Sequence, residues 1–285
     1  MAPNRPRALQ VFAGPRALSH LRERGLKPAD VRVMPAAAGG PKGLVLNPLD
    51  RFLFGHWLAG SGHTVHLLGA SIGAWRMACA TLPDADAALA QLAELYIHQQ
   101  YDVPEGGWPD AAEVSRVFAE LLGRQFGGRE AEVLGHPRYR LHVLTSRGRA
   151  ALLRREGRWR TPLGYAGAYA ANLRERAALG RWLERVVFSD PRDALPLPLT
   201  DFATRSVALV PANLGPALQA SGSIPFVLKA VHDISGAPPG AYWDGGITDY
   251  HLHLDYAAMA DGLVLYPHFQ RTLVPGWLDK GLKRR

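Results

Sequence analysis

HLLGASIGAWRMA, residues 66–78, places a single serine between two glycines, where an apolar run meets a helix-forming run. The GASIG portion matches G-x-S-x-G, a turn in which a strand reverses sharply into a helix and presents the serine. Gly69 and Gly73 would leave room for that turn. The pattern predicts a nucleophile at Ser71, and the alternative is a serine that only caps the following helix.

Strands and helices alternate along the rest of the chain. The sequence predicts strands over 30–38, 63–70, 139–147, 185–190, 205–211, 241–246 and 262–267, and helices over 43–58, 71–82, 84–100, 111–126 and 164–182. This alternation predicts an α/β fold, a three-layer α/β/α sandwich with a mostly parallel central sheet. Ser71 and Gly39 each follow a predicted strand, so we expect both at the edge formed by the strands' carboxyl ends.

Composition narrows the class of protein. A chain of 285 residues that is 47% hydrophobic can bury one large core. Cys79 is the only cysteine, so we expect a lone buried thiol and a reducing, cytoplasmic setting. The N-terminal residues lack the apolar stretch of a secretory signal, and no apolar run reaches the roughly 20 residues of a spanning helix.

The positive charge is concentrated in one segment. The net charge is +8, and residues 138–185 hold twelve arginines against three glutamates, an excess of 12 − 3 = +9. Such a segment would attract phosphates, so we expect peripheral contact with an anionic membrane surface. No nucleic-acid-binding motif accompanies the arginines, so nucleic acid is not expected. The alternative is a solvated arginine-rich face.

A glycine-rich loop follows the first predicted strand. AAAGGPKGL, residues 36–44, leaves backbone N–H groups free to stabilise a developing negative charge. The phosphate-loop motif G-x-x-x-x-G-K-[ST] is absent, because Gly43 follows Lys42.

Four ordered stretches resemble the patatin-like phospholipase family. They are GGPKG (39–43), GASIG (69–73), LQASGSIPFVL (218–228) and YWDGGITD (242–249), which correspond to the family's G-G-x-[KR]-G, G-x-S-x-G, A-S-x-[AS]-x-P and D-G-[GA] motifs. Ala38 stands where many members have a third glycine, and ITDYHLHLD replaces the usual Asn and Pro after DGG. The resemblance implies a hydrolase domain over 31–270, with an N-terminal extension (1–30) and a basic C-terminal tail (271–285).

The resemblance also implies a mechanism and its residues. Ser71 would be the nucleophile of a catalytic dyad and Asp244 its base. The oxyanion hole would be formed by the backbone amides of Gly39, Gly40, Lys42 and Ile72, and Gly43, Gly69, Gly73, Gly245 and Gly246 would support these motifs. The Lys42 side chain would order the loop or contact a head group. The expected activity is lipid acyl hydrolysis of the phospholipase A or carboxylesterase type, without cofactor or metal, on a lipid or small ester.

Three alternatives use the same residues differently. An α/β-hydrolase-like esterase would need an imidazole as base, and His251, His253 and His268 are the candidates. An extended strand over HLHLD (251–255) would set His251, His253 and Asp255 on one face, where they could be metal ligands. The other interpretation is a half-exposed strand that exposes these polar residues and buries Leu252 and Leu254. The third alternative is a non-catalytic lipid-binding module. The sequence predicts neither acyl length nor oligomeric state.

Overall fold

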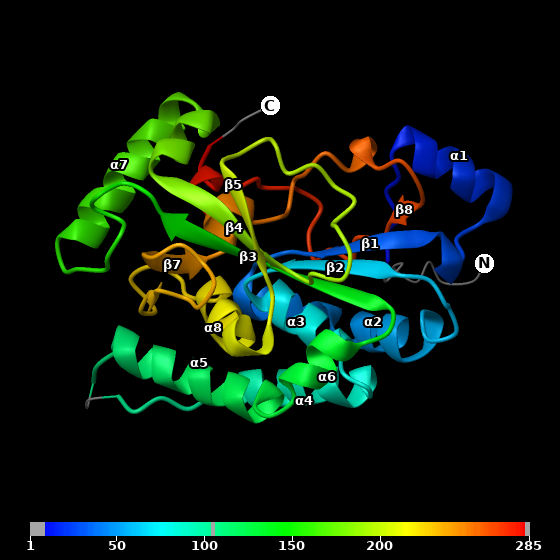
Figure 1. The fold of residues 1–285 in the computed structure, drawn as a ribbon, viewed down its shortest axis with the longest axis horizontal. Helices are drawn as coiled ribbons and strands as arrows, with labels where there is room; N and C mark the ends of the chain where they lie inside the picture. The colour runs from blue at the N-terminus through cyan, green and yellow to red at the C-terminus, as the bar shows by residue number, and fades with distance from the viewer. Residues whose placement is uncertain (1–8, 104–105, 283–285) are drawn as a thin grey trace, which may run out of the picture.

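The computed structural model describes residues 9–103 and 106–282, which form one mixed, mostly parallel sheet with flanking helices (Figure 1). The strands of this described part are β1 (Val31–Ala36), β2 (Val65–Ala70), β3 (Tyr139–Gly148), β4 (Leu183–Ser189), β5 (Thr204–Ala208), β6 (Val231–His232), β7 (Ala241–Asp244) and β8 (Leu263–Val264). Their order is β5-β4-β3-β2-β1-β8, and β7 pairs with β3 and β6. β4 and β7 run antiparallel to β3, and β6 runs antiparallel to β7.

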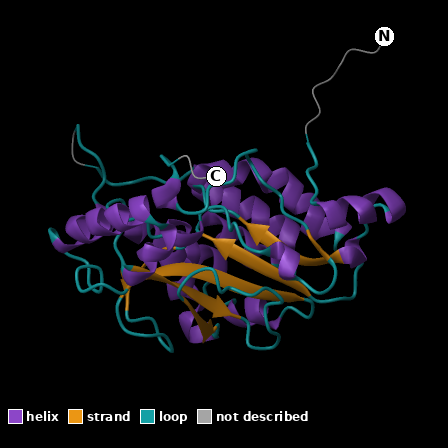
Figure 2. Ribbon diagram, turned by 90° about the horizontal axis from the view of Figure 1, so that it is seen from above, coloured by secondary structure: helices purple, strands orange, loops and turns teal. Residues whose placement is uncertain are grey.

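Helices complete the predicted three-layer α/β/α sandwich, which is confirmed. They are α1 (Pro15–Arg24), α2 (Asn47–Phe52), α3 (Ile72–Ala80), α4 (Ala85–Ile97), α5 (Ala111–Phe126), α6 (Glu130–Gly135), α7 (Arg160–Arg174), α8 (Pro211–Ser221) and α9 (Gly246–Asp249). Figure 1 shows α3 and α8 below the sheet with α4, α5 and α6 beneath them, while α1 and α7 lie on the upper side at opposite ends. Figure 2 shows the strands side by side across the molecule.

The central strands are apolar because both of their faces are covered. In β2, Leu67 belongs to the core shared with α3, α4 and α5, whereas Leu68 packs in a second core with Leu252 and Leu254. Val143 and Leu144 of β3 divide between the same two cores. A strand buried on both sides gives a continuous apolar run rather than an alternating one, which is the pattern of residues 65–70.

Some predicted elements differ from the observed ones. The helix over 111–126 is confirmed, but the single helix over 43–58 is wrong: a 3₁₀ turn spans Gly40–Leu46, α2 follows, and a π-helical turn spans Leu53–Trp57. The prolines at 41 and 48 allow a helix to start but not to continue through them. The helix over 164–182 ends at Arg174, because Glu175 is extended and a 3₁₀ turn follows.

The predicted strand over HLHLD (251–255) is wrong as well. These residues form a turn and an irregular segment, and Leu252 has a φ of 40°, which no strand residue adopts. Leu252 and Leu254 are buried and His253 and Asp255 are exposed, as expected of the apolar and polar residues. His251 is buried, so it does not share a face with the two exposed residues.

The ends of the described chain differ in how they pack. α1 contains no buried residue, whereas Leu278 and Asp279, within the predicted C-terminal tail, are buried. Asp279 accepts hydrogen bonds from Asn172 of α7 and from Arg176, which ties this segment to the domain. Among residues 9–103 and 106–282, no helix combines the length and apolar character needed to cross a bilayer.

Part of the charge excess of residues 138–185 is balanced by acids elsewhere in the chain, which pair with three of its arginines. The pairs are Arg155–Asp233, Arg176–Asp279, Arg185–Asp201 and Arg185–Asp249. Within the segment, Glu184 pairs with Arg147. Among the described residues, seven other arginines of the segment have no carboxylate within salt-bridge distance: Arg138, Arg140, Arg154, Arg158, Arg160, Arg174 and Arg181. The segment therefore keeps a basic surface, although a smaller one than the sequence suggests.

Candidate active site

The turn between β2 and α3 holds Ser71 in a strained conformation. Its φ is 56° and its ψ is −133°, a region that side-chain-bearing residues rarely adopt. A side chain at Gly69 would lie 2.5 Å from the backbone of Ala74, and one at Gly73 would lie 2.0 Å from the carbonyl oxygen of Ala36. The two glycines therefore let the strand, the turn and the helix approach each other closely, as predicted for a nucleophile turn.

Two strands that run toward each other bring the site together. β2 pairs in parallel with the first part of β3, ending with Ala70 beside Leu144. β7 pairs antiparallel with the next part of β3, ending with Asp244 beside Thr145. The ends of β2 and β7 therefore meet along the same side of β3, and this places Ser71 next to Asp244.

Asp244 is a buried carboxylate that faces the nucleophile. It accepts a hydrogen bond of 2.6 Å from the Gly246 amide, and the Ser71 side chain lies close enough to lower the pKa of the carboxylate. Burial is the larger effect and raises the pKa of Asp244 to about 7, although Ser71, the Gly246 amide and the charge of Lys280 act in the opposite direction. A carboxylate with this pKa can take a proton from a hydroxyl at neutral pH and return it.

Ser221 braces both halves of the site, a role that the sequence did not indicate. Its hydroxyl accepts from the Ser71 amide at 2.9 Å and donates to the Leu144 carbonyl at 2.7 Å, while its carbonyl accepts from the Gly245 amide at 3.2 Å. The Asp244 amide donates to the carbonyl of Ser223. The segment LQASGSIPFVL (218–228) therefore holds both the turn at Ser71 and the turn at Asp244 in place. Its likeness to a family motif was the only signal in the sequence.

The predicted oxyanion loop lies against the start of α3. Gly40 has a φ of 55°, so glycine is needed there, and a side chain at Gly43 would lie 2.8 Å from Ile72 Cγ2. Within the described part of the chain, the amides of Gly39, Gly40 and Ile72 have no hydrogen-bond acceptor. The Lys42 amide makes a long hydrogen bond of 3.4 Å to the Gly39 carbonyl. Three of the four predicted donors are therefore available to a substrate oxygen.

The candidate histidines do not contact the nucleophile. His251 Nδ1 accepts from the Val274 amide at 2.8 Å, and burial lowers its pKa to about 3. His268 Nδ1 lies 2.6 Å from the carbonyl of Gln270, and His253 is exposed. Among the described residues, no imidazole hydrogen-bonds to Ser71 or Asp244, and no three His, Cys, Asp or Glu side chains could hold a metal ion.

Aromatic residues and one lysine surround the dyad, and the sequence singled out none of them. Tyr165, Tyr96 and Tyr250 lie close enough for the Asp244 charge to act on their hydroxyls. The Lys280 ammonium lies 4.0 Å from the centre of the Tyr250 ring. Tyr96 lies on α4, Tyr165 on α7, Tyr250 directly after α9, and Lys280 near the end of the described chain. Because they come from separate elements, their neighbours in the sequence give no sign of the site.

No protein-family model matches this sequence, and neither does any curated protein. The likeness to patatin-like phospholipases therefore rests on the four motifs.

Proposed function

We propose that the protein is a serine ester hydrolase that cleaves carboxylic esters of lipids, or small esters, through a Ser71–Asp244 dyad. One observation carries the proposal: a strained serine at the end of β2 lies beside a buried carboxylate at the end of β7, whose pKa is raised to about 7. A serine hydroxyl needs a base to become a nucleophile, and Asp244 is the base in contact with it. The absence of an imidazole from this contact, among the described residues, favours a dyad over a triad.

The acylation step uses groups that are already in contact. Ser71 Oγ attacks the ester carbonyl carbon while Asp244 accepts the hydroxyl proton. The carbonyl oxygen becomes an oxyanion that accepts hydrogen bonds from the free amides of Gly39, Gly40 and Ile72. The C–O bond to the alcohol then breaks, and Asp244 gives its proton to the departing oxygen.

Deacylation repeats the sequence with water. Asp244 accepts a proton from the water that attacks the acyl carbon, and the bond between that carbon and Ser71 Oγ breaks. The proton returns to Ser71 Oγ, which restores the dyad and releases the fatty acid. No cofactor is needed. The buried thiol of Cys79, whose pKa is raised by burial, is consistent with the cytoplasmic setting that we also propose.

A fluorophosphonate probe tests the proposal directly, because it reacts only with an activated serine. We expect the chain to be labelled at Ser71, and the Ser71→Ala chain not to be labelled. A chain that folds but resists labelling would instead fit a non-catalytic lipid-binding module. A chain-length series of nitrophenyl esters, run beside phospholipid vesicles, would then define the acyl and head groups.

A further inference from the structure

The outer face of α7 is apolar although it is exposed. Trp159, at its N-cap, and Leu163, Tyr169 and Leu173 are 72%, 60%, 42% and 52% exposed. Their spacing places them on one side of the helix, and the exposed alanines at 166 and 170 lie in the same stripe. The opposite side, including Tyr165, packs into a buried core. α7 is therefore apolar on both of its sides.

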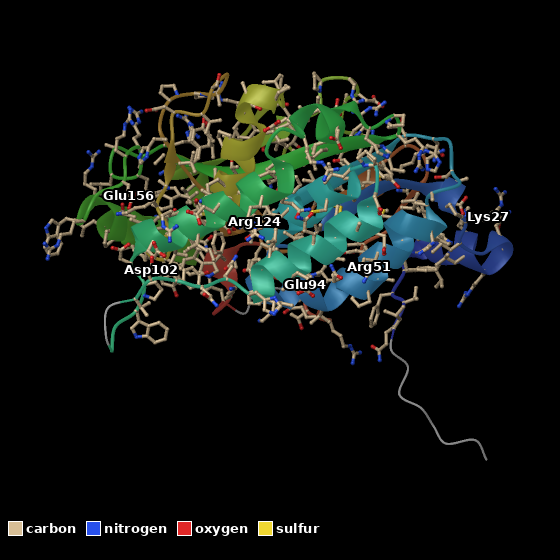
Figure 3. The ribbon with its side chains drawn as sticks, turned by 90° about the horizontal axis from the view of Figure 1, so that it is seen from below. Lys27, Arg51, Glu94, Asp102, Arg124 and Glu156 are labelled. Atoms are coloured by element: carbon tan, nitrogen blue, oxygen red, sulfur yellow. The ribbon has the colours of Figure 1, made fainter. Side chains whose placement is uncertain are left out.

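α5 is a surface helix of the same fold, and its solvent-exposed side is charged. Its buried side is apolar, and its exposed side carries Glu113, Arg116 and Glu120, which form ion pairs with one another. Figure 3 shows the charged side chains of this lower surface, among them Arg51, Glu94 and Arg124. Because an exposed apolar stripe flanked by polar residues marks an interaction site, the contrast indicates that something covers α7.

The charges on α7 itself are all positive, and the nearest acids, Glu156 and Glu175, lie just outside its two ends. The sequence has no acidic residue between Glu156 and Glu175, and Arg158, Arg160 and Arg174 lie near the two ends of α7. Within the described residues, Arg158 and Arg174 have no carboxylate partner, and the Arg158 guanidinium lies 5.5 Å from the centre of the Trp159 ring. Figure 1 shows α7 at an outer edge of the molecule, with no element beyond it.

We propose that this α7 surface, formed by Trp159, Leu163, Tyr169 and Leu173 with Arg158 and Arg174, docks on an anionic lipid bilayer. Tryptophan and tyrosine favour the head-group region, leucines enter the acyl boundary, and arginines pair with lipid phosphates. A second copy of the chain suits the surface poorly. Pairing two α7 helices in either direction would set Arg160 and Arg174 against like charges, and the acids Glu156 and Glu175 lie only beyond the ends of the helix.

A cavity lies at the N-terminal end of the α7 surface. Its volume is about 600 Å³, and its lining includes Arg158, Pro162, Phe226, Leu228 and Trp243. Phe226 and the following valine are about half exposed, and the Phe226 ring packs against Tyr165 of α7. Docking through α7 would bring the mouth of this cavity to the lipid surface.

Vesicle co-sedimentation tests the docking. The Ser71→Ala chain is used, so that hydrolysis cannot alter the vesicles, with phosphatidylcholine vesicles that contain or lack phosphatidylglycerol. We expect tighter binding to the anionic vesicles. The double substitution Leu163→Ser/Leu173→Ser should weaken that binding by about 10-fold or more, because it removes apolar surface from the contact. Phe52→Ser, on α2 and as exposed as Leu173, is the matched control and should bind like its parent.

A second double variant tests what the two arginines contribute to docking. Arg158→Gln/Arg174→Gln should reduce the preference for anionic vesicles by about 30-fold, since each arginine near the surface contributes about 1 kcal/mol and the two together about 2 kcal/mol. The proposal is overturned if the parent chain ignores anionic vesicles, or if the leucine variant binds as well as its parent. It is also overturned if light scattering finds a dimer that the leucine variant converts to monomer, because the surface would then be a self-interface.

These outcomes are separate from those that test hydrolysis. In the chain that retains Ser71, the leucine variant should turn over a short, soluble nitrophenyl ester at the parental rate. Loss of vesicle binding in a chain that never hydrolyses esters would keep the docking surface and reject the proposed function. Normal ester turnover, combined with undiminished vesicle binding by the leucine variant, would keep the proposed function and reject the docking surface.

Discussion

Two buried carboxylates on the same short stretch of chain have opposite surroundings. Asp244 ends β7 and Asp249 ends α9, and they are 5% and 1% exposed. Asp249 is held by Arg185, whose Nη2 and Nε atoms lie 2.5 and 2.7 Å from its oxygens, and by the Thr248 hydroxyl. In the described part of the chain, no cation lies within salt-bridge distance of Asp244.

This difference separates a structural carboxylate from a reactive one. The charge of Asp249 is balanced by a buried arginine, so it serves the fold: removing one partner of a buried pair leaves an uncompensated charge. Asp244 has no cation within salt-bridge distance in the described part of the chain, and burial raises its pKa to about 7 although the more distant charge of Lys280 acts in the opposite direction. Under the proposed mechanism, a buried carboxylate can serve as a base where no cation pairs with it directly, and it serves the fold where one does.

The largest expected effect is the loss of turnover when the dyad is broken. Ser71→Ala and Asp244→Asn should each lower kcat by about 10³-fold or more, because the first removes the nucleophile and the second removes the base. Steady-state hydrolysis of a nitrophenyl ester at saturating concentration measures this, with circular dichroism to check folding. Parental turnover by folded Asp244→Asn would place Asp244 in the same structural class as Asp249.

Histidine substitutions are the controls for this prediction. His251→Ala, His253→Ala and His268→Ala should each retain most of the parental kcat, since none of these imidazoles contacts Ser71 or Asp244. A fall comparable to that of Asp244→Asn in any one of them would indicate a triad.

The second expected effect concerns stability and not turnover. Asp249→Asn should lower the free energy of unfolding by about 3 kcal/mol, because it leaves Arg185 with a reduced set of partners in the interior. Asp201 still pairs with Arg185, so the loss should be smaller for Asp201→Asn, whose side chain is 45% exposed. Urea unfolding measures both. If Asp244→Asn were the more destabilising of the two buried substitutions, the division of roles would be reversed.

The third effect tests the oxyanion loop. Gly40→Val should lower kcat by about 10²-fold, because a β-branched residue cannot easily keep the φ of 55° that sets the amide. Pro41→Ala, at a position without an amide hydrogen, is the control and should retain activity. Unchanged turnover by folded Gly40→Val would remove the loop from the mechanism.

The smallest effect is the pH dependence. Activity under the proposed mechanism requires ionised Asp244, so kcat should be half-maximal near pH 7, level off about one unit above it and fall about 10-fold per unit well below it. For stability the sign is opposite: the folded-state pKa exceeds the ordinary value of 3.8, so protonated Asp244 favours folding, and this contribution is lost as pH rises to about 7. Asp244→Asn should therefore gain stability relative to the parent over this range, in urea titrations at pH 5 and 8.

The sequence by itself determined the elements whose signals are local. The strand, turn and helix around Ser71 depend on glycines two residues on either side, and the helix over 111–126 depends on apolar spacing and its capping aspartate. Asp244 was identified only through a resemblance, because no periodicity links it to Ser71. The fold class followed from the alternation of strands and helices.

Only the tertiary structure decided which charges and apolar residues find partners. The meeting of β2 and β7 beside β3 paired Ser71 with Asp244, and the packing of α9 gave Arg185 to Asp249. It also left one side of α7 uncovered, and it bent residues 251–255 away from the predicted strand. The physical reason is that sequence spacing reports where a side chain points along its own element, whereas its partner comes from an element elsewhere in the chain.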